Sequence, residues 1–225
     1  MDPREDEKRA AAEAAALEVQ NGTTLGLGTG TTVAHFLPAL ARRKLEVMCV
    51  ATSQATEDIA HKLGLPLQPF DLLERLDLAV DGADQVAPDM WLVKGGGGAH
   101  TREKIVASAA ERFVVIASSD KLVDRLGPPV PVEVLRFGVA ATLRRLADIG
   151  PVEQREAPPT PDGNPLFHLM VAMDDPRALA SELDSIPGVV GHGLFQPELV
   201  SEVIVGRADG TVERRERRER RDPRR

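Results

Sequence analysis

Four ionisable side chains gather in one short stretch of the 225-residue sequence: Asp81, Asp84, Lys94 and Glu103. Carboxylates and an ammonium group are what proton transfer and the stabilisation of a developing negative charge require. Four consecutive glycines, Gly95–Gly98, follow the lysine, and backbone without side chains lets a ligand approach closely. Asp-Gly turns and a glutamate in a first helical turn are also common structural features, but the four groups together favour a catalytic site.

The flanking segments predict that the two aspartates lie at one edge of a sheet. Residues 76–80 (LDLAV) are a short apolar run between turn residues, which predicts a buried strand. Asp81 and Asp84 are then expected on the loop that leaves the carboxyl end of this strand, where open α/β sheets bind ligands. Residues 92–93 predict a second short strand directly before Lys94.

A helix is predicted from Thr101 onward (TREKIVASAAERF), because its apolar residues have helical spacing. Ile105 and Ala109 are expected on its apolar face. Glu103 then lies in the first turn, just after the glycine run. None of the five histidines has metal-ligand spacing, and only His100 lies near enough in the sequence to touch this site.

A second glycine-rich segment predicts a phosphate-binding turn. Residues 23–27 predict a strand, which runs into Gly28-Thr29-Gly30-Thr31-Thr32 and then into a helix through Arg43. Pro38 is expected to kink or split that helix. Backbone N–H groups at a helix start lack intrahelical partners and carry partial positive charge, so they suit an anion, and the threonines add hydroxyl donors. A purely structural turn is the alternative.

The glycine spacing excludes a dinucleotide fingerprint and a P-loop. Counted from Gly26 the third glycine would fall on Thr31, and counted from Gly28 it would fall on Val33. The next predicted strand ends at residues 52–53 (Thr-Ser) instead of an acidic residue, and no Gly-Lys-Ser/Thr follows the turn. These observations favour a small phosphorylated ligand over NAD or ATP, and they disfavour a nicotinamide-dependent oxidoreductase.

The composition is typical of a globular protein, with 42% hydrophobic residues, 28% charged residues and a formal net charge of −7. This net negative charge does not indicate nucleic-acid binding, and no apolar run approaches the length of a membrane span. The N-terminus lacks the pattern of a signal peptide, so a cytoplasmic protein is expected. The single cysteine, Cys49, lies in an apolar run and is expected in the core, so no disulfide or cysteine-based metal site is predicted.

A proline-rich segment, residues 127–131 (GPPVP), predicts a domain boundary. The expected parts are a first domain at 1–128, completed by about 206–213, a small α+β domain at 129–205, and a disordered arginine-rich tail at 214–225. In the second domain, helices are expected at 139–148 and 177–184 and strands at 152–155, 166–173 and 189–195. Elsewhere, strands are expected at 45–51, 65–70, 113–117 and 199–205, the last of which returns the chain to the first domain.

Six motifs closely resemble the type A ribose-5-phosphate isomerases, and the resemblance runs over residues 22–210. The motifs are LGLGTGTT at 25–32, DGAD at 81–84, KGGGG at 94–98, REKI at 102–105, PVEV at 131–134 and IPGVV at 186–190. The block from Asp81 to Glu103 is the most specific part. The resemblance implies an α/β fold, with a Rossmann-like domain and a smaller ferredoxin-like α+β lid domain.

The resemblance also implies an enzyme that interconverts D-ribose 5-phosphate and D-ribulose 5-phosphate in the pentose phosphate pathway. Such enzymes use no metal or other cofactor and form homodimers or homotetramers. Glu103 would be the proton acceptor and Lys94 would stabilise negative charge, while Asp81 and Asp84 would contact the sugar. The residues implied to bind the substrate are Thr29, Gly30, Thr31, Thr32, Gly82, Ala83, Gly95, Gly96, Gly97 and Lys121.

Several positions depart from the family pattern. Ser118-Ser119-Asp120-Lys121 stands where the family has Asp-Glu-Ser-Lys, which keeps the lysine but alters the acidic contacts. In the lid, residues 160–164 read Thr-Pro-Asp-Gly-Asn and His168 replaces an aspartate, and Gln85 stands where glutamate is usual. A non-enzymatic sugar-phosphate sensor is the alternative function. Only about 20 residues precede the first strand, too few for a helix-turn-helix domain.

Overall fold

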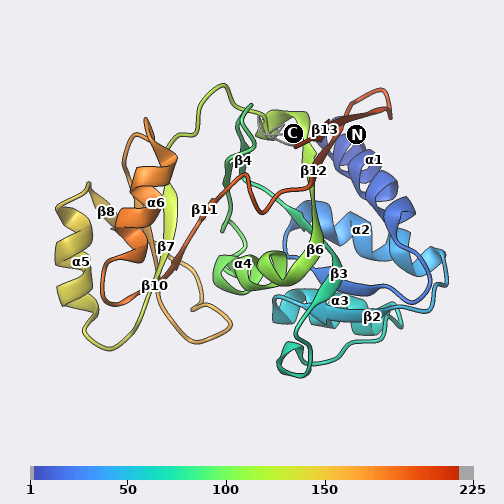
Figure 1. Cartoon of the computed structure of the whole chain (residues 1–225), viewed down its shortest axis with the longest axis horizontal. Helices are drawn as coiled ribbons and strands as arrows, with labels where there is room; N and C mark the ends of the chain where they lie inside the picture. The colour runs from blue at the N-terminus through green and yellow to red at the C-terminus, as the bar shows by residue number, and fades with distance from the viewer. Residues whose placement is uncertain (1–2, 218–225) are drawn as a thin grey trace, which may run out of the picture.

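The computed structural model describes residues 3–217. It contains a six-stranded sheet (Figure 1). In chain order the strands are β1 (Thr24–Leu27), β2 (Met48–Ala51), β3 (Leu76–Gly82), β6 (Ala110–Ser118), β12 (Glu202–Gly206) and β13 (Val212–Glu216). Their order across the sheet is β13-β12-β6-β3-β1-β2. All neighbours are parallel except β13, which pairs antiparallel with β12. The predicted parallel α/β sheet and the C-terminal return of the chain are therefore confirmed.

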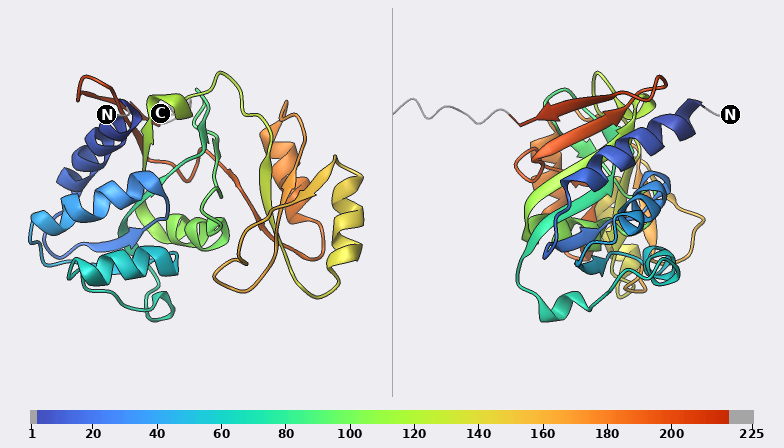
Figure 2. Two further views of the ribbon diagram at one scale, coloured as in Figure 1. Left: turned by 180° about the vertical axis from the view of Figure 1, so that it is seen from behind. Right: turned by 90° about the vertical axis from the view of Figure 1, so that its right-hand side faces the viewer.

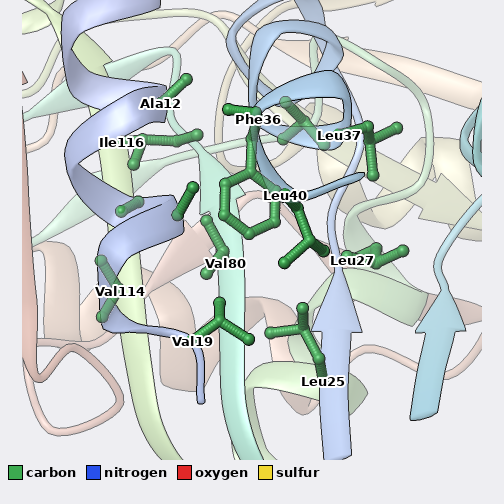
Figure 3. Close-up of a cluster of buried hydrophobic side chains, with 14 of the residues drawn as sticks. Ala12, Val19, Leu25, Leu27, Phe36, Leu37, Leu40, Val80, Val114 and Ile116 are labelled. Atoms are coloured by element: carbon green, nitrogen blue, oxygen red, sulfur yellow. The ribbon is translucent and has the colours of Figure 1, made fainter. Parts of the chain in front are cut away.

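Helices cover both faces of this sheet, since its strands are apolar on both sides. They are α1 (Pro3–Glu18), α2 (Thr31–Arg42), α3 (Gln54–Lys62) and α4 (His100–Ala109). On one face, Phe36 and Leu40 of α2 pack with Ala12 of α1 against Leu27 and Val80 of the strands (Figure 3). α4 covers the opposite face, and α3 lies beside the edge strand β2. The β-strands thus have a core on each side.

The inward face of α4 differs from the predicted one. Ile105 is 51% exposed, whereas Glu103, Val106 and Ala107 are buried, so the expectation that Ile105 belongs to the apolar face is wrong. Val106 packs against the backbone of β1, where a Cβ atom on Gly26 would lie 2.4 Å from Val106 Cγ1. The absence of a side chain at Gly26 lets α4 lie close to the sheet, with Glu103 turned inward.

A second, four-stranded antiparallel sheet lies beside the first (Figures 1 and 2). In chain order its elements are β7 (Val130–Val134), α5 (Val139–Ala147), β8 (Val152–Gln154), β9 (Leu166–Leu169), α6 (Pro176–Asp184) and β10 (Val189–His192). The strand order is β10-β7-β9-β8, and the βαββαβ sequence is that of a ferredoxin-like unit. We call these elements the small sheet unit, residues 130–192. The exact domain boundaries at 128, 205 and 213 stay a prediction.

A three-stranded antiparallel sheet joins the two units, and its strands are β4 (Gln85–Val86), β5 (Leu92–Val93) and β11 (Leu194–Phe195). The strand expected at 189–195 is therefore two strands in two sheets, separated at Gly193. The N–H of Gly193 donates to the Pro131 carbonyl, and the Gly193 carbonyl accepts from the N–H of Lys94. A Cβ atom at this glycine would lie 2.1 Å from the Lys94 carbonyl oxygen, so the crossing strands require a glycine.

Three further expectations need correction. Residues 65–70 form no strand: Leu67 makes one isolated bridge to Cys49, and a short 3-10 turn, η1 (Phe70–Leu72), follows. α2 runs without interruption through Pro38. The predicted start of the disordered tail at residue 214 is wrong, because residues 214–216 belong to β13. There Arg214 pairs with Glu202 of the neighbouring strand. Residues 218–225 of that tail lie outside the described residues. Cys49 is buried in the core, as expected.

Within residues 3–217, no helix has the length and apolar character needed to cross a membrane. Over the same residues, no group of three or more histidine, cysteine, aspartate or glutamate side chains is placed to bind a metal ion.

Candidate active site

Lys94 lies between two carboxylates in the interior of the protein. Its Nζ atom is 2.9 Å from Asp81 Oδ2 and 3.1 Å from Glu103 Oε2, and each of the three side chains is at most 4% exposed. Asp81 comes from β3, Lys94 directly follows β5, and Glu103 lies in the first turn of α4. We call these three residues the Lys94 cluster. The fold thus brings together three of the four ionisable groups that the sequence predicts to act together.

Asp81 belongs to β3 itself, so the prediction that it lies on the following loop is wrong. Its Oδ1 atom accepts hydrogen bonds from the N–H groups of Gly82, at 2.7 Å, and Thr29, at 3.1 Å. Gly28 leaves the space for this carboxylate, because a Cβ atom there would lie 2.0 Å from Asp81 Cγ. The turn between β1 and α2 is therefore fixed against the end of β3, next to the Lys94 cluster.

The glycine run lies between Asp84 and the threonine turn. Asp84, on the loop after β3, accepts a 2.7 Å hydrogen bond from the N–H of Gly96 through Oδ2. A Cβ atom on Gly96 would lie 2.5 Å from Asp84 Oδ1, and one on Gly97 would lie 3.0 Å from Thr29 Cγ2. The glycines thus admit two other predicted site residues, Asp84 and Thr29, while the predicted close approach of a ligand stays a prediction.

Two side chains contact the start of the glycine run, and the sequence predicted only one of them, His100, near this site. Arg155, which follows β8, donates to the carbonyls of Gly95, at 2.8 Å, and Gly96. Nothing local in the sequence connects residue 155 to residue 95, so the sequence does not predict this contact. His100 is buried behind the run, where a Cβ atom on Gly95 would lie 3.0 Å from its Nδ1 atom. Burial lowers the pKa of His100 to about 4, so its ring is neutral at pH 7.

The threonine turn presents a helix start toward solvent. Gly30 is the N-cap of α2, with a φ of 134° that favours glycine, and Gly30 and Thr31 are exposed while Thr32 is buried. The Thr29 hydroxyl is turned inward, since it lies 2.7 Å from Ser53 Oγ and 2.9 Å from Thr52 Oγ1. The donors left for an anion are therefore the first N–H groups of the helix and the Thr31 hydroxyl, rather than the hydroxyl of Thr29.

Lys121 lies on a short 3-10 turn, η2 (Ser119–Lys121), at the carboxyl end of β6. Its neighbour Leu122 bridges Val86 of β4, which places this turn beside the segment that follows Asp84. The Lys121 ammonium is about one-third exposed and lies 3.6 Å from Asp120 Oδ2. The lysine is thus at the same sheet edge as the Lys94 cluster, and its ammonium pairs with the aspartate of its own turn.

Burial dominates the electrostatics of the Lys94 cluster. The pKa of Glu103 is raised to about 8: loss of solvent is the largest cause, repulsion from Asp81 adds to it, and attraction to Lys94 opposes both. Burial also raises the pKa of Asp81, partly offset by Lys94. For Lys94, burial acts to lower the pKa, but the two carboxylates outweigh it, and the pKa is raised above its ordinary value. The lysine is therefore a fixed cation, and Glu103 exchanges its proton near neutral pH.

A cavity of about 700 Å³ lies on the other side of α4. It is lined by Thr101, Arg102 and Ile105 of that helix, with Phe70 and Val190 opposite. Its lining does not include any residue of the Lys94 cluster, so its size gives no information about the chemistry. The assignment of the site depends on the buried charges and the glycine run instead.

Buried proton-transfer groups beside a helix start, at the carboxyl edge of a parallel sheet, define an α/β enzyme that moves protons on a small anionic ligand. Comparison with known proteins makes this class specific. The model of one family, described as ribose 5-phosphate isomerase A (phosphoriboisomerase A), matches residues 48–210. The chain belongs to this family.

Individual relatives resemble nearly the whole chain. Ribose-5-phosphate isomerase A of Caulobacter vibrioides strain NA1000 is 45% identical, over 92% of this chain and 97% of its own, and that of Roseiflexus castenholzii is 47% identical, over 92% and 94%. A crystal structure from Neisseria gonorrhoeae has a TM-score of 0.89 at 33% identity, covering 94% of this chain and 96% of the other. A D-ribose-5-phosphate isomerase in complex with phospho-erythronic acid has a TM-score of 0.89 at 34% identity, covering 95% and 99%.

Proposed function

We propose that this protein interconverts D-ribose 5-phosphate and D-ribulose 5-phosphate through an enediolate. The single observation that carries the proposal is the Lys94 cluster, in which a buried ammonium lies within 3.1 Å of two buried carboxylates. Membership of the ribose 5-phosphate isomerase A family supports the same reaction. A sensor domain has no need of a buried acid–base set, so the enzymatic function is preferred to the alternative.

Glu103 is the proposed base. Moving a carbonyl from C1 to C2 requires a group that removes the C2 proton and returns it to C1, while a second proton passes from the C2 hydroxyl to the C1 oxygen. A carboxylate with a pKa of about 8 binds and releases a proton near physiological pH, which is where general acid–base catalysis is most effective. Such catalysis typically contributes about 10²–10⁴-fold in rate.

Lys94 is proposed to stabilise the negative charge that develops on the enediolate oxygen. It is fixed before the reaction begins, because its Nζ atom also donates to the Gly82 carbonyl and its own N–H donates to Gly193. A fixed donor in a site without water is worth more than a mobile one, and removal of one such donor typically costs about 3 kcal/mol. Gly95, Gly96 and Gly97 lie on the same segment and are proposed to bind the sugar, although the N–H of Gly96 already donates to Asp84.

Asp81 and Asp84 are proposed to contact the sugar hydroxyls and to assist ring opening by proton exchange. Their environments differ, which supports different roles. Asp81 is buried against Lys94, whereas Asp84 is bonded to the N–H of Gly96 at the exposed glycine run. Gly82 and Ala83, which separate the two aspartates, complete the proposed sugar site.

The phosphate is proposed to bind at the start of α2, on Thr29-Gly30-Thr31-Thr32, with Lys121 as a further cation. Exposure of Gly30 and Thr31 at a helix N-terminus supports this role, because the dipole of the helix and its free N–H groups attract an anion. The bond from the Thr29 N–H to Asp81 connects the phosphate site to the sugar site.

The proposal extends to the biological setting: a cytoplasmic enzyme of the pentose phosphate pathway that acts without a metal or other cofactor, as a homodimer or homotetramer. Exposed apolar side chains on the small sheet unit support self-association, since Phe137 is 88% exposed and Leu135 and Val190 are also exposed. Size-exclusion chromatography with light scattering tests this part, and a monomer at micromolar concentration would contradict it.

The reaction is tested by incubating the purified protein with ribose 5-phosphate, without added cofactor and with a chelator, and following ketose formation. Glu103→Gln serves as the background control. Turnover that persists in the chelator supports the proposal. A folded protein, as judged by circular dichroism, that forms no ketose would refute it.

A further inference from the structure

The first turn of α4 is bonded to the small sheet unit through a buried carboxylate. Thr101 donates its hydroxyl to Glu133 Oε2 at 2.6 Å. Glu133, on β7, is only 1% exposed, and its other oxygen accepts from Thr160 Oγ1 and Asn164 Nδ2, each at 2.8 Å. We call these four residues the Glu133 cluster. It joins the helix that carries Glu103 to a strand and a loop of the small sheet unit.

Neighbouring residues of α4 are bonded in the same direction. Arg102 makes a two-pronged contact with Asp162, at 2.9 Å from Nε and 2.7 Å from Nη2, and Asp162 lies on the loop between Thr160 and Asn164. Lys104 donates to the His192 carbonyl at 2.8 Å. The residues before and after Glu103 are thus bonded to the small sheet unit, while Glu103 itself faces Lys94.

Apolar packing alone does not set the position of Glu103. Val106 and Ala107 pack α4 onto the main sheet, and such apolar contacts are non-directional. Hydrogen bonds to a buried carboxylate have defined lengths and angles, and leaving one unmade is costly. Among the bonds described from α4 to the small sheet unit, the one from Thr101 to Glu133 is made to a buried carboxylate.

The small sheet unit is built to admit this bond. Gly191, on β10, lies over the Thr101 side chain, and a Cβ atom there would lie 2.6 Å from Thr101 Oγ1. The glycine leaves the space that the hydroxyl occupies. Glu133 has three hydrogen-bond donors, so its carboxylate is satisfied although it is withdrawn from water.

We propose that Glu133 is a positioning residue, which acts through Thr101 to fix the start of α4 so that Glu103 keeps its place beside Lys94. The proposal rests on the proposed function, in which Glu103 transfers the proton. Misplacement of a reacting group by about 1 Å can cost about 10²-fold in rate, even when the altered residue is remote from the chemistry. The effect is therefore expected in kcat rather than in KM.

The test compares Thr101→Val with Thr142→Val. Both changes remove one threonine hydroxyl beside a glycine of the small sheet unit, but Thr142 donates to the Pro187 carbonyl instead of to a partner of α4. Thr101→Val is expected to lower kcat about 10-fold or more with KM changed less than about two-fold. Thr142→Val and Thr101→Ser, which keeps the hydroxyl, are expected to retain kcat within about two-fold. Thr101→Ala replaces the valine variant if the latter does not fold.

Hydrogen–deuterium exchange of the same proteins gives a readout that does not depend on turnover. Exchange of the amides in the Gly95–Glu103 segment is expected to rise in Thr101→Val and to stay unchanged in Thr142→Val. The positioning role is overturned if Thr101→Val keeps the wild-type kcat and exchange, or if Thr142→Val lowers kcat equally. Failure of the proposed function is a separate outcome, since the wild-type protein itself would then form no ketose.

Discussion

The Lys94 cluster and the Glu133 cluster are both buried and polar, yet they satisfy their charges differently. Both Glu133 oxygens have hydrogen-bond donors, three in all, that come from neutral side chains. In the Lys94 cluster two carboxylates share one ammonium, and the pKa of Glu103 rises to about 8. A buried carboxylate whose oxygens all have hydrogen-bond donors holds the surrounding structure in place. A buried carboxylate whose loss of solvent is only partly offset has a raised pKa and can bind and release a proton. The contrast supports the two proposed roles, proton transfer in the Lys94 cluster and positioning in the Glu133 cluster.

The largest effect is expected at the proton-transfer group. Glu103→Gln keeps the shape of the side chain but removes the base, so kcat should fall by about 10²–10⁴-fold while ribose 5-phosphate still binds. Steady-state kinetics and calorimetry measure the two quantities. Glu111→Gln, a change at an exposed position of β6, is the matched control. Unchanged turnover in Glu103→Gln would remove this residue from the mechanism.

A pH profile sharpens the same contrast. The raised pKa of Glu103 means that the free enzyme carries a protonated, inactive Glu103 below pH 8 and an ionised base above it. The value of kcat/KM should therefore rise about tenfold per pH unit up to about pH 8 and then level off, so that it is about 100-fold lower at pH 6. A profile that is already flat from pH 6 would show that Glu103 is ionised there.

The sequence predicted which residues come together better than it predicted how they are placed. Asp81, Lys94 and Glu103 attract attention as residue types near a glycine run, and the fold brings them together. The inward face of α4 was predicted incorrectly, because hydrophobic periodicity places Ile105 on the buried face, whereas the protein buries the Glu103 carboxylate there. A site that buries charge violates the pattern from which faces are inferred.

Contacts between distant segments had no local signal at all. Arg155 and Gly95 are 60 positions apart, and Thr101 and Glu133 are 32 positions apart, and each bond exists only because two sheets meet. The single strand predicted at 189–195 was wrong for the same reason, since only the packing of Lys94 against Gly193 shows where the chain passes from one sheet to the next. Hydrophobic periodicity indicates which residues of a segment are buried, but it does not indicate which distant segment packs against them.

A smaller effect is expected where the threonine turn meets Asp81. In Gly28→Ala the new Cβ atom would lie 2.0 Å from Asp81 Cγ, so the turn or the carboxylate must move. Overpacking of this kind typically lowers the free energy of unfolding by about 1–3 kcal/mol, and displacement of Asp81 should lower kcat as well. Urea denaturation and steady-state kinetics measure both. Gly127→Ala, at a position with open space around it, should leave both unchanged, and an equal loss there would contradict the explanation.

The smallest effect is expected at the exposed edge of the Glu133 cluster. Asp162→Asn and Asp174→Asn each remove the acidic partner of an exposed arginine, Arg102 and Arg125 respectively. Exposed ion pairs stabilise proteins by at most about 1 kcal/mol, so neither variant should unfold detectably earlier in urea. Only Arg102 lies on α4, so kcat should fall a few-fold in Asp162→Asn and stay unchanged in Asp174→Asn. Equal kcat values in the two variants would mean that the buried bond from Thr101 to Glu133 positions the helix without help from the surface pair.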